Sequence, residues 1–546
     1  MTISTSTTTT TSTPTSMPIN NQLQPLVNEL KELAHLNAVS ALLDWDRATY
    51  MPNKSIDIRS EQMALIGRLV HEKHTGEKIR SLLSEHVDLN TGNIRTDKID
   101  KKDKKDKKDK EDAGTTNYTE KEKRLLKETY RSWRIANGLP TEFVAELSKL
   151  LPKAMHVWEE AKEKKDFNLF APYLEKIIDA KRKEADYIGW SKAPYDALLD
   201  QYEPGTTQDE ISIVFEDLKK GTLELLNKIK ASPNFGKENR LKNVTHTFDL
   251  NKQWDFGLKV LEAMGIDFNY LRQDKSAHPF STSLHPTDVR ITTRMCEKDF
   301  LESLTSTIHE GGHALYELGL PVEWYGTPLG EARSMGIHES QSRLFENIIG
   351  RGRSFWTHYY PILKSYFPKE LVGVSVEDLY YAFNEIIISP VRLKADELTY
   401  NLHIIIRFEI EKLIINDSSV KVFDLPEIWN QKYQEYLGVT PKDHAEGILQ
   451  DVHWSGGMMG YFPSYTLGNI YGLQFYKQAT KELGNLNYKF EKGNLKELTG
   501  WLKEKIYQKG KEKSVPELLL EITGEKLNTR PLLDYLENKY KEIYNF

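Results

Sequence analysis

Apolar residues recur at helical spacing along most of this chain. Two clear stretches are Leu26, Val27, Leu30, Leu33 and Ala34, and Leu402, Ile405, Ile406, Ile410 and Leu413. Spacing of three and four residues places such side chains on one face of an α-helix. Signals for β-strands are few, and the best is the short β-branched segment 289–293. The pattern therefore predicts a mainly α protein with a small β-sheet.

The segment that follows this strand predicts a helix with unusual residues inside it. Its apolar positions keep helical spacing, and Asp299 can cap its first turn: Phe300, Leu304, Ile308, Leu315 and Leu318. Gly311 and Gly312 interrupt the helix, where each costs roughly 1 kcal/mol relative to alanine. We therefore expect a substrate backbone or a neighbouring element to pass close to this face of the helix.

The same helix contains the sequence His-Glu-Gly-Gly-His at residues 309–313. His309 and His313 are four residues apart, so both imidazoles can bind one metal ion from one face of the helix. Glu310 is placed to take a proton from a zinc-bound water. A catalytic zinc takes three protein ligands and keeps one position open for water. The pentapeptide thus predicts most of a hydrolytic zinc site.

Glu339 is the candidate for the third metal ligand. Twenty-five residues separate it from His313, and it lies in the segment 335–347, which reads as a second amphipathic helix. A loop rich in proline and glycine would let this helix return to the first. Arg343, one turn after Glu339, can hydrogen-bond its carboxylate. The alternative is an exposed Glu339–Arg343 pair, worth a few tenths of a kcal/mol.

Six short motifs then occur in a fixed order. They are His278-Pro279-Phe280, Asp288-Val289-Arg290-Ile291-Thr292, His309-Glu310-Gly311-Gly312-His313, His338-Glu339-Ser340-Gln341, Val391-Arg392-Leu393-Lys394-Ala395-Asp396 and Gly447-Ile448-Leu449-Gln450-Asp451-Val452-His453-Trp454. Together they resemble the signature set of the carboxypeptidase Taq family of metallocarboxypeptidases, from about Leu23 to the C-terminus. Val391, where the family usually has isoleucine, is a conservative departure. The resemblance implies two helical lobes around a deep central cleft, similar to angiotensin-converting enzyme and neurolysin.

The resemblance also implies roles for residues outside the metal helix. His453 and Tyr465 are the implied donors to the oxyanion, although both also fit as ordinary buried residues. Arg392 is the first candidate for binding the free carboxylate of a substrate, because a guanidinium group can donate two parallel hydrogen bonds to it. A structural ion pair with Asp396, one turn away on the same helix, is the alternative. Arg290 is the second candidate, or it braces the cleft wall.

Composition narrows the class of protein. Only 39% of the residues are hydrophobic, and no apolar run is long enough to span a membrane as a helix, so no transmembrane helix is expected. A single cysteine, Cys296, allows no internal disulfide and suits a reducing compartment. The net charge of −6 gives no reason to expect nucleic acid or a membrane as partner. We expect a cytoplasmic enzyme, and the resemblance implies a homodimer.

Two segments lack the apolar residues that a folded core requires. Residues 1–19 are rich in Ser and Thr, fit no targeting signal, and are predicted to be a disordered tail. The Lys/Asp run 101–110 predicts a solvated, low-complexity insertion at about 97–117, and a basic binding arm is the alternative. The rest, residues 20–546, is predicted to be one catalytic domain.

The predicted reaction is hydrolysis of the C-terminal peptide bond of peptides with a free C-terminus, with broad specificity. One Zn²⁺ per chain would activate water with Glu310 as general base, although Co²⁺ or Mn²⁺ also suits two histidines and a glutamate. An oligopeptidase of the same clan, cutting internally, is the first alternative. A non-catalytic peptide-binding protein is the second, and the intact base and ligands argue against it.

Overall fold

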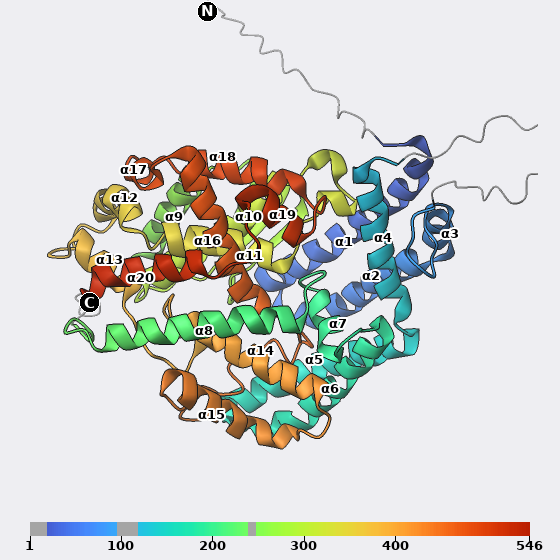
Figure 1. The fold of residues 1–546 in the computed structure, drawn as a ribbon, viewed down its shortest axis with the longest axis horizontal. Coiled ribbons are helices and arrows are strands. Elements are labelled where there is room, and N and C mark those ends of the chain that lie inside the picture. Colours follow the sequence, from blue (N-terminus) through green and yellow to red (C-terminus); the bar gives the residue numbers. More distant parts are fainter. Residues whose placement is uncertain (1–18, 96–117, 238–246) are drawn as a thin grey trace, which may run out of the picture.

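The computed structural model describes residues 19–95, 118–237 and 247–546, and most of them are helical (Figure 1). The predicted insertion and all of the predicted tail except Ile19 lie outside the described residues. The helices of the first half are α1 (Gln24–Thr49), α2 (Ile56–Thr75), α3 (Glu77–His86), α4 (Glu120–Gly138), α5 (Thr141–Lys164), α6 (Phe167–Ile188), α7 (Pro194–Asp200), α8 (Gln208–Lys230) and α9 (Leu250–Met264).

The second half continues with eleven further helices among the described residues. They are α10 (Phe300–Gly319), α11 (Met335–Arg343), α12 (Arg353–Tyr366), α13 (Val376–Asn384), α14 (Tyr400–Asn416), α15 (Leu425–Leu437), α16 (Pro463–Leu483), α17 (Leu486–Glu491), α18 (Lys496–Lys505), α19 (Val515–Thr523) and α20 (Arg530–Tyr544). The prediction of a mainly α protein is confirmed. In the part of the chain that the structure describes, no helix is both long and apolar enough to cross a lipid bilayer.

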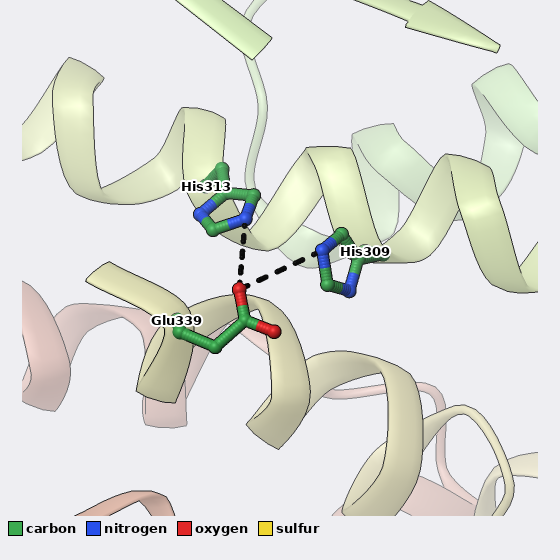
Figure 2. Close-up of side chains that lie close together, drawn as sticks. All are labelled: His309, His313 and Glu339. Carbon is green, nitrogen blue, oxygen red and sulfur yellow. Dashed lines mark ion pairs between the residues drawn. The ribbon is translucent and has the colours of Figure 1, made fainter. Parts of the chain in front are cut away.

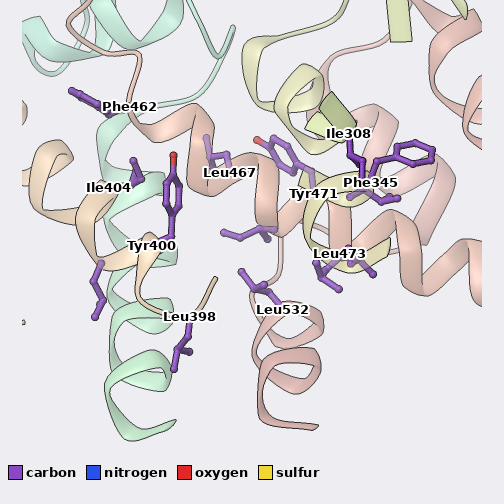
Figure 3. Packing of buried hydrophobic residues seen from close by; sticks show 14 of the residues in the cluster. Ile308, Phe345, Leu398, Tyr400, Ile404, Phe462, Leu467, Tyr471, Leu473 and Leu532 are labelled. Carbon is purple, nitrogen blue, oxygen red and sulfur yellow. The ribbon is translucent and has the colours of Figure 1, made fainter. Parts of the chain in front are cut away.

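Buried apolar side chains form two clusters of very different size. The larger one includes residues from α5 to α20, and Figure 3 shows Ile404 of α14, Leu467 of α16 and Leu532 of α20 within it. The smaller one joins α1, α3 and α4 through side chains such as Leu26 and Leu83. These three helices and α2 lie together at one end of the molecule (Figure 1).

A three-stranded sheet lies beside α10. The strands β1 (Leu271–Lys275), β2 (Ser281–His285) and β3 (Asp288–Thr293) are arranged in the order β1-β3-β2. The central strand β3 contains the predicted segment 289–293 and runs parallel to β1 and antiparallel to β2. Its β-branched Val289 and Ile291 are fully buried, which explains why this short segment forms a strand. The predicted small sheet is confirmed.

Helix α10 forms where its apolar spacing predicts it, and Asp299 caps it by accepting a hydrogen bond from the Glu302 amide at 2.9 Å. Its two interior glycines lie where other helices approach closely. A Cβ built on Gly311 would lie 2.4 Å from the Leu261 side chain of α9, and one on Gly312 would lie 2.6 Å from Ser342 Cα of α11. A neighbouring element therefore does pass this face, and it is the protein's own backbone.

Helix α11 lies between α10 and α16 at backbone contact distance. A Cβ built on Gly468 of α16 would likewise lie 2.8 Å from Glu339 Cβ. A helix forms where one was predicted over 335–347, but the prediction that it is amphipathic is wrong, because α11 is buried on nearly all sides. It continues as a buried π-helical turn, Leu344–Ile349, which reorients the side chains that follow.

Candidate metal centre and active site

His309 and His313 of α10 and Glu339 of α11 point toward one another (Figure 2). Glu339 Oε2 lies 3.8 Å from His309 Nε2 and 3.3 Å from His313 Nε2. Ligand atoms around one tetrahedral zinc ion are separated by roughly 3.3 Å, given bonds of about 2.0–2.1 Å. The three side chains thus fit a single divalent ion, and two imidazoles with one carboxylate are a donor set that such ions favour.

A carboxylate holds the first histidine in place. Nδ1 of His309 is 2.8 Å from Oε2 of Glu346, which lies in the π-helical turn after α11. Glu346 in turn accepts hydrogen bonds from Arg343 at 3.3 Å and Arg351 at 3.1 Å. Burial lowers the pKa of His309, but the charges of Glu339 and Glu346 outweigh it and raise that pKa to about 9. Its Nε2 is thereby directed at the metal position.

The second histidine is held by another imidazole. Nδ1 of His313 lies 2.5 Å from Nδ1 of His338, and Nε2 of His338 lies 2.8 Å from Oε1 of Glu317. Burial, reinforced by the charges of the two neighbouring histidines, lowers the pKa of His313 to about 4. A neutral imidazole with Nδ1 occupied presents Nε2 to a metal ion, as His309 does.

Glu339 is buried, with 5% of its surface exposed. Burial raises its pKa, but His309, His313 and Arg343 together hold the pKa well below its usual range. Arg343 Nε donates a hydrogen bond to Oε1 at 2.8 Å, which leaves Oε2 facing the histidines. The alternative of an exposed surface pair with Arg343 is therefore wrong, because both partners are in the interior of the site.

Glu310 lies beside the two histidines and is also buried. Burial raises its pKa to about 7, and the nearby charges of Glu339 and Glu346 act in the same direction while His309 opposes them. A carboxyl group with a pKa near neutrality can both accept and release a proton under ordinary conditions.

His453 and Tyr465 are brought together, with His453 Nε2 at 3.1 Å from the Tyr465 hydroxyl. His453 precedes α16 and Tyr465 lies in its first turn. Burial lowers the pKa of His453 to about 3, so the imidazole is neutral. Tyr465 lies near enough to Glu339 for that charge to contribute to its raised pKa, after the larger effects of burial and Tyr461.

Arg392 lies in a 3-10 turn, Arg392–Lys394, rather than on a helix with Asp396. Its Nη2 is 2.8 Å from Asp451 Oδ1, and its Nη1 donates to the Tyr400 hydroxyl at 2.9 Å. Asp396 instead accepts hydrogen bonds from Thr399, at the start of α14. The alternative of an Arg392–Asp396 ion pair is therefore wrong, because the chain turns between the two residues.

A second arginine shares the same acidic partner. Arg407 of α14 is fully buried, and its Nη2 lies 2.6 Å from Asp451 Oδ2. The two guanidinium groups hold the pKa of Asp451 far below its usual range, although burial alone would raise it. Two positive charges thus face one negative charge.

Arg290 lies on β3, and its surroundings differ from those of Arg392. Its Nε is 3.0 Å from Asp288 Oδ1, and its guanidinium lies 4.4 Å from the ring centre of Trp45 on α1. These contacts join the sheet to α1.

Several residues of the site were not predicted from the sequence: Glu346, Glu317, Arg351 and Arg407, and the hydrogen-bonding role of His338. Two of them carried a signal, since Glu317 lies one helical turn after His313 and Glu346 lies three residues after Arg343. The other contacts arise from tertiary packing.

A helical fold in which two neighbouring helices bring together two imidazoles and a carboxylate, with a buried glutamate beside them, defines a metallopeptidase. Residues 25–540 match the family model described as carboxypeptidase Taq (M32) metallopeptidase. The chain therefore belongs to the carboxypeptidase Taq family and is a metallocarboxypeptidase, a metal-dependent hydrolase that acts on peptides.

Similar proteins cover nearly the whole chain. Carboxypeptidase 1 of Bacillus subtilis is 39% identical over 97% of this chain and 100% of its own. Thermostable carboxypeptidase 1 of Thermus thermophilus is 38% identical over 95% of this chain and 98% of its own. The solved structure of an M32 carboxypeptidase from Deinococcus radiodurans has a TM-score of 0.88 at 35% identity, covering 96% of this chain and 100% of that one.

Proposed function

We propose that this enzyme releases the C-terminal residue of peptides with broad side-chain preference, using one Zn²⁺ ion held by His309, His313 and Glu339. The observation that carries the proposal is the convergence of these three side chains beside a buried Glu310. A divalent ion at this position acidifies water and polarises the peptide carbonyl. Co²⁺ and Mn²⁺ are accepted by the same donors, so the ion used depends on supply.

Glu310 is the general base in this proposal. Its pKa of about 7 lets it take a proton from the attacking water and then pass that proton to the departing amine. The low polarity around its carboxyl group is what sets this pKa, because burial is the largest contribution to the shift.

Tyr465 and His453 are the proposed donors to the oxyanion. Tyr465 has a raised pKa, so its hydroxyl keeps its proton and can donate a hydrogen bond. His453 is neutral and lies 3.1 Å from that hydroxyl, which orients it. One donor of this kind typically lowers the barrier by about 2.7–4 kcal/mol.

Arg392 is the proposed binding residue for the substrate's free carboxylate. Arg392 and Arg407 share the single carboxylate of Asp451, so this region has positive charge left over. Tyr400 links the two halves of the site, because Arg392 donates to its hydroxyl and Arg343 lies 4.1 Å from its ring centre. We assign Arg290 to bracing α1 against the sheet, since its partners are Asp288 and Trp45.

Further properties rest on the family resemblance or, for the location, on composition. We propose that the fold forms two lobes around a deep cleft, similar to angiotensin-converting enzyme and neurolysin. We also propose that residues 20–546 form one catalytic domain, and that the enzyme works as a homodimer in the cytoplasm.

The test of the proposal compares wild type with Glu310→Gln on N-blocked dipeptides, before and after chelation and metal add-back. We expect the variant to bind metal and to release the C-terminal amino acid at least about 100-fold more slowly. The control is Glu302→Gln, an exposed glutamate in the first turn of the same helix, which should leave the rate unchanged. Retained turnover in Glu310→Gln would refute the role of Glu310 as base.

A further inference from the structure

Glu203 is a fully buried carboxylate that the proposed reaction does not use. It follows α7 and has none of its surface exposed. One of its oxygens, Oε1, accepts a hydrogen bond from the Ser464 hydroxyl at 2.8 Å and another from the Gly336 amide. Burial raises the pKa of Glu203 to about 7, and these two hydrogen bonds partly oppose the shift.

The two donors lie at the starts of α11 and α16, two of the helices that carry proposed active-site residues. Gly336 is the second residue of α11, three residues before Glu339. Ser464 is the second residue of α16 and precedes Tyr465. The backbone next to Glu203 adds a further contact, because the Met335 amide donates to the Tyr202 carbonyl at 3.1 Å. The dipeptide Tyr202–Glu203 thus contacts the start of both helices.

The fit at this point is tight. A Cβ built on Gly336 would lie 2.7 Å from Glu203 Oε1 and 2.9 Å from the Tyr471 ring, so only glycine is accommodated. The first amides of a helix have no partner within the helix, and an oxygen acceptor satisfies them. Burying a carboxyl group is costly, and the two hydrogen bonds that Glu203 accepts at Oε1 offset part of that cost. A residue that served only as filling would be apolar at this position.

The sides of α11 are fixed by other contacts. Gly312 of α10 and Gly468 of α16 both contact it closely, and Arg343 holds Glu339 near its end. These contacts set the distance between the helices. Glu203 instead contacts the N-terminal ends, where a hydrogen bond limits sliding along the helix axis.

We propose that Glu203 is a positioning residue: through one carboxyl oxygen it sets the axial position of α11 and α16, so that Glu339 meets His309 and His313 and Tyr465 meets His453. The inference rests on the proposed function, because it assigns Glu339 as metal ligand and Tyr465 as oxyanion donor.

The test uses variants that differ in what they present to the two helices. Since Oε1 accepts both hydrogen bonds, Glu203→Gln can present its amide oxygen at the same place, whereas Glu203→Met keeps the length and loses the acceptor. The matched control is Glu411→Met. Glu411 is also fully buried, but its partners are Tyr195, Trp454 and Gly460.

The full-length proteins are stripped of metal, and zinc affinity is measured by competition with a chromophoric chelator, alongside thermal unfolding. We expect Glu203→Met to weaken zinc binding about 10–100-fold, as is typical when the support of a ligand is lost. Glu203→Gln should stay within about 3-fold of wild type, which is less than 1 kcal/mol. Glu411→Met should unfold at lower temperature and bind zinc like wild type.

Wild-type zinc affinity in folded Glu203→Met would overturn the inference, as would equal losses in the Gln and Met variants or a comparable loss in Glu411→Met. If Glu203→Met does not fold, the inference is tested with Ser464→Ala, because this variant removes only the hydrogen bond between Glu203 and α16. We expect it to lower kcat about 10-fold with zinc affinity unchanged, and unchanged kcat would contradict the proposal.

Zinc binding by a third variant, His309→Ala, distinguishes failure of the proposed function from failure of the inference about Glu203. If His309→Ala binds zinc as tightly as wild type, the metal site itself is wrong and the inference about Glu203 fails with it. If His309→Ala loses zinc while Glu203→Met keeps it, only the inference about Glu203 fails.

Discussion

Two adjacent groups of charged side chains differ in the sign of the charge that they have left over. In the acidic cluster, Glu339 and Glu346 pair with the guanidinium groups of Arg343 and Arg351, and a third carboxylate, Glu317, pairs with His338. In the arginine cluster, Arg392 and Arg407 both form ion pairs with Asp451. Tyr400 contacts both clusters, through Arg343 and Arg392.

The difference indicates what each cluster binds. Buried charge is costly unless it is paired, so unbalanced charge in the interior points to a ligand of opposite sign. Burial lowers the pKa of His309, but the charges of Glu339 and Glu346 raise it to about 9, so a proton and a metal ion compete for the same place. The surplus in the arginine cluster suits an anion, such as the carboxylate at the end of a peptide.

The largest expected effect comes from neutralising the acidic cluster. Glu339→Gln removes a metal ligand together with the surplus negative charge, and zinc affinity should fall by roughly 1,000-fold, about a third of a typical site's binding energy. Competition with a chromophoric chelator measures this. Arg392→Gln is the matched control, because it alters the other cluster and should bind zinc like wild type. Tight zinc binding by Glu339→Gln would show that the acidic cluster does not bind the metal ion through Glu339, which contradicts the difference proposed between the two clusters.

The next effect concerns the arginine cluster. Arg392→Gln should lower kcat/KM on N-blocked dipeptides, because the substrate carboxylate loses its charged partner. The expected decrease corresponds to an activation barrier that is higher by about 2–5 kcal/mol. Arg290→Gln serves as the control and should have a much smaller effect, since Arg290 contacts Asp288 and Trp45. Equal losses in the two arginine variants would remove the reason for assigning the substrate carboxylate to Arg392.

The clusters should also respond differently to pH. Glu411, which lies near Arg407, has a pKa raised by burial from 4.5 to about 7. Its stability contribution is complete below pH 4.5 and is lost as pH rises through 7, by about 3 kcal/mol. The sign reverses for Glu346, whose pKa is lowered, so its contribution is present above pH 4.5 and lost as pH falls further.

Unfolding in urea at pH 5, 6, 7 and 8 checks the first of these signs. The unfolding free energy of Glu411→Gln should decline less steeply over this range than that of wild type, whatever its absolute value. Parallel curves would show that Glu411 does not take up a proton on folding.

The smallest expected effects come from changing the residues that hydrogen-bond the two histidines, Glu346 for His309 and His338 for His313. Glu346→Gln removes the charge behind His309 and should weaken zinc binding about 10–100-fold. His338→Gln should cost less, because an amide can accept from His313 Nδ1 and donate to Glu317, as the imidazole does. The same chelator competition ranks the two variants, and the opposite order would show that the carboxylate behind His309 is not the stronger support.

The local features of the acidic cluster could be predicted from the sequence. Helical spacing and an Asp299 cap gave α10, and the i, i+4 rule placed His309 and His313 on one face. The character of α11 could not be predicted in this way. It is buried on both sides because glycines of α10 and α16 admit its backbone, and those glycines are distant in the sequence.

The arginine cluster depends on contacts between distant segments. Arg392 and Asp451 are 59 residues apart, and Arg407 and Asp451 are 44 residues apart. Spacing rules describe only neighbours on one helix, so they suggested Asp396 as the partner of Arg392. The 3-10 turn at Arg392–Lys394 places Asp396 at the start of α14 instead.

The most direct test of this division of labour uses one pair of substrates. Metal-loaded wild-type enzyme is incubated with an N-blocked dipeptide and with the same peptide carrying a C-terminal amide, and release of the last residue is measured. The arginine cluster should select the free carboxylate, so only the acid should be hydrolysed at an appreciable rate. Comparable cleavage of the amide would contradict the account and indicate a peptidase that does not read the C-terminus.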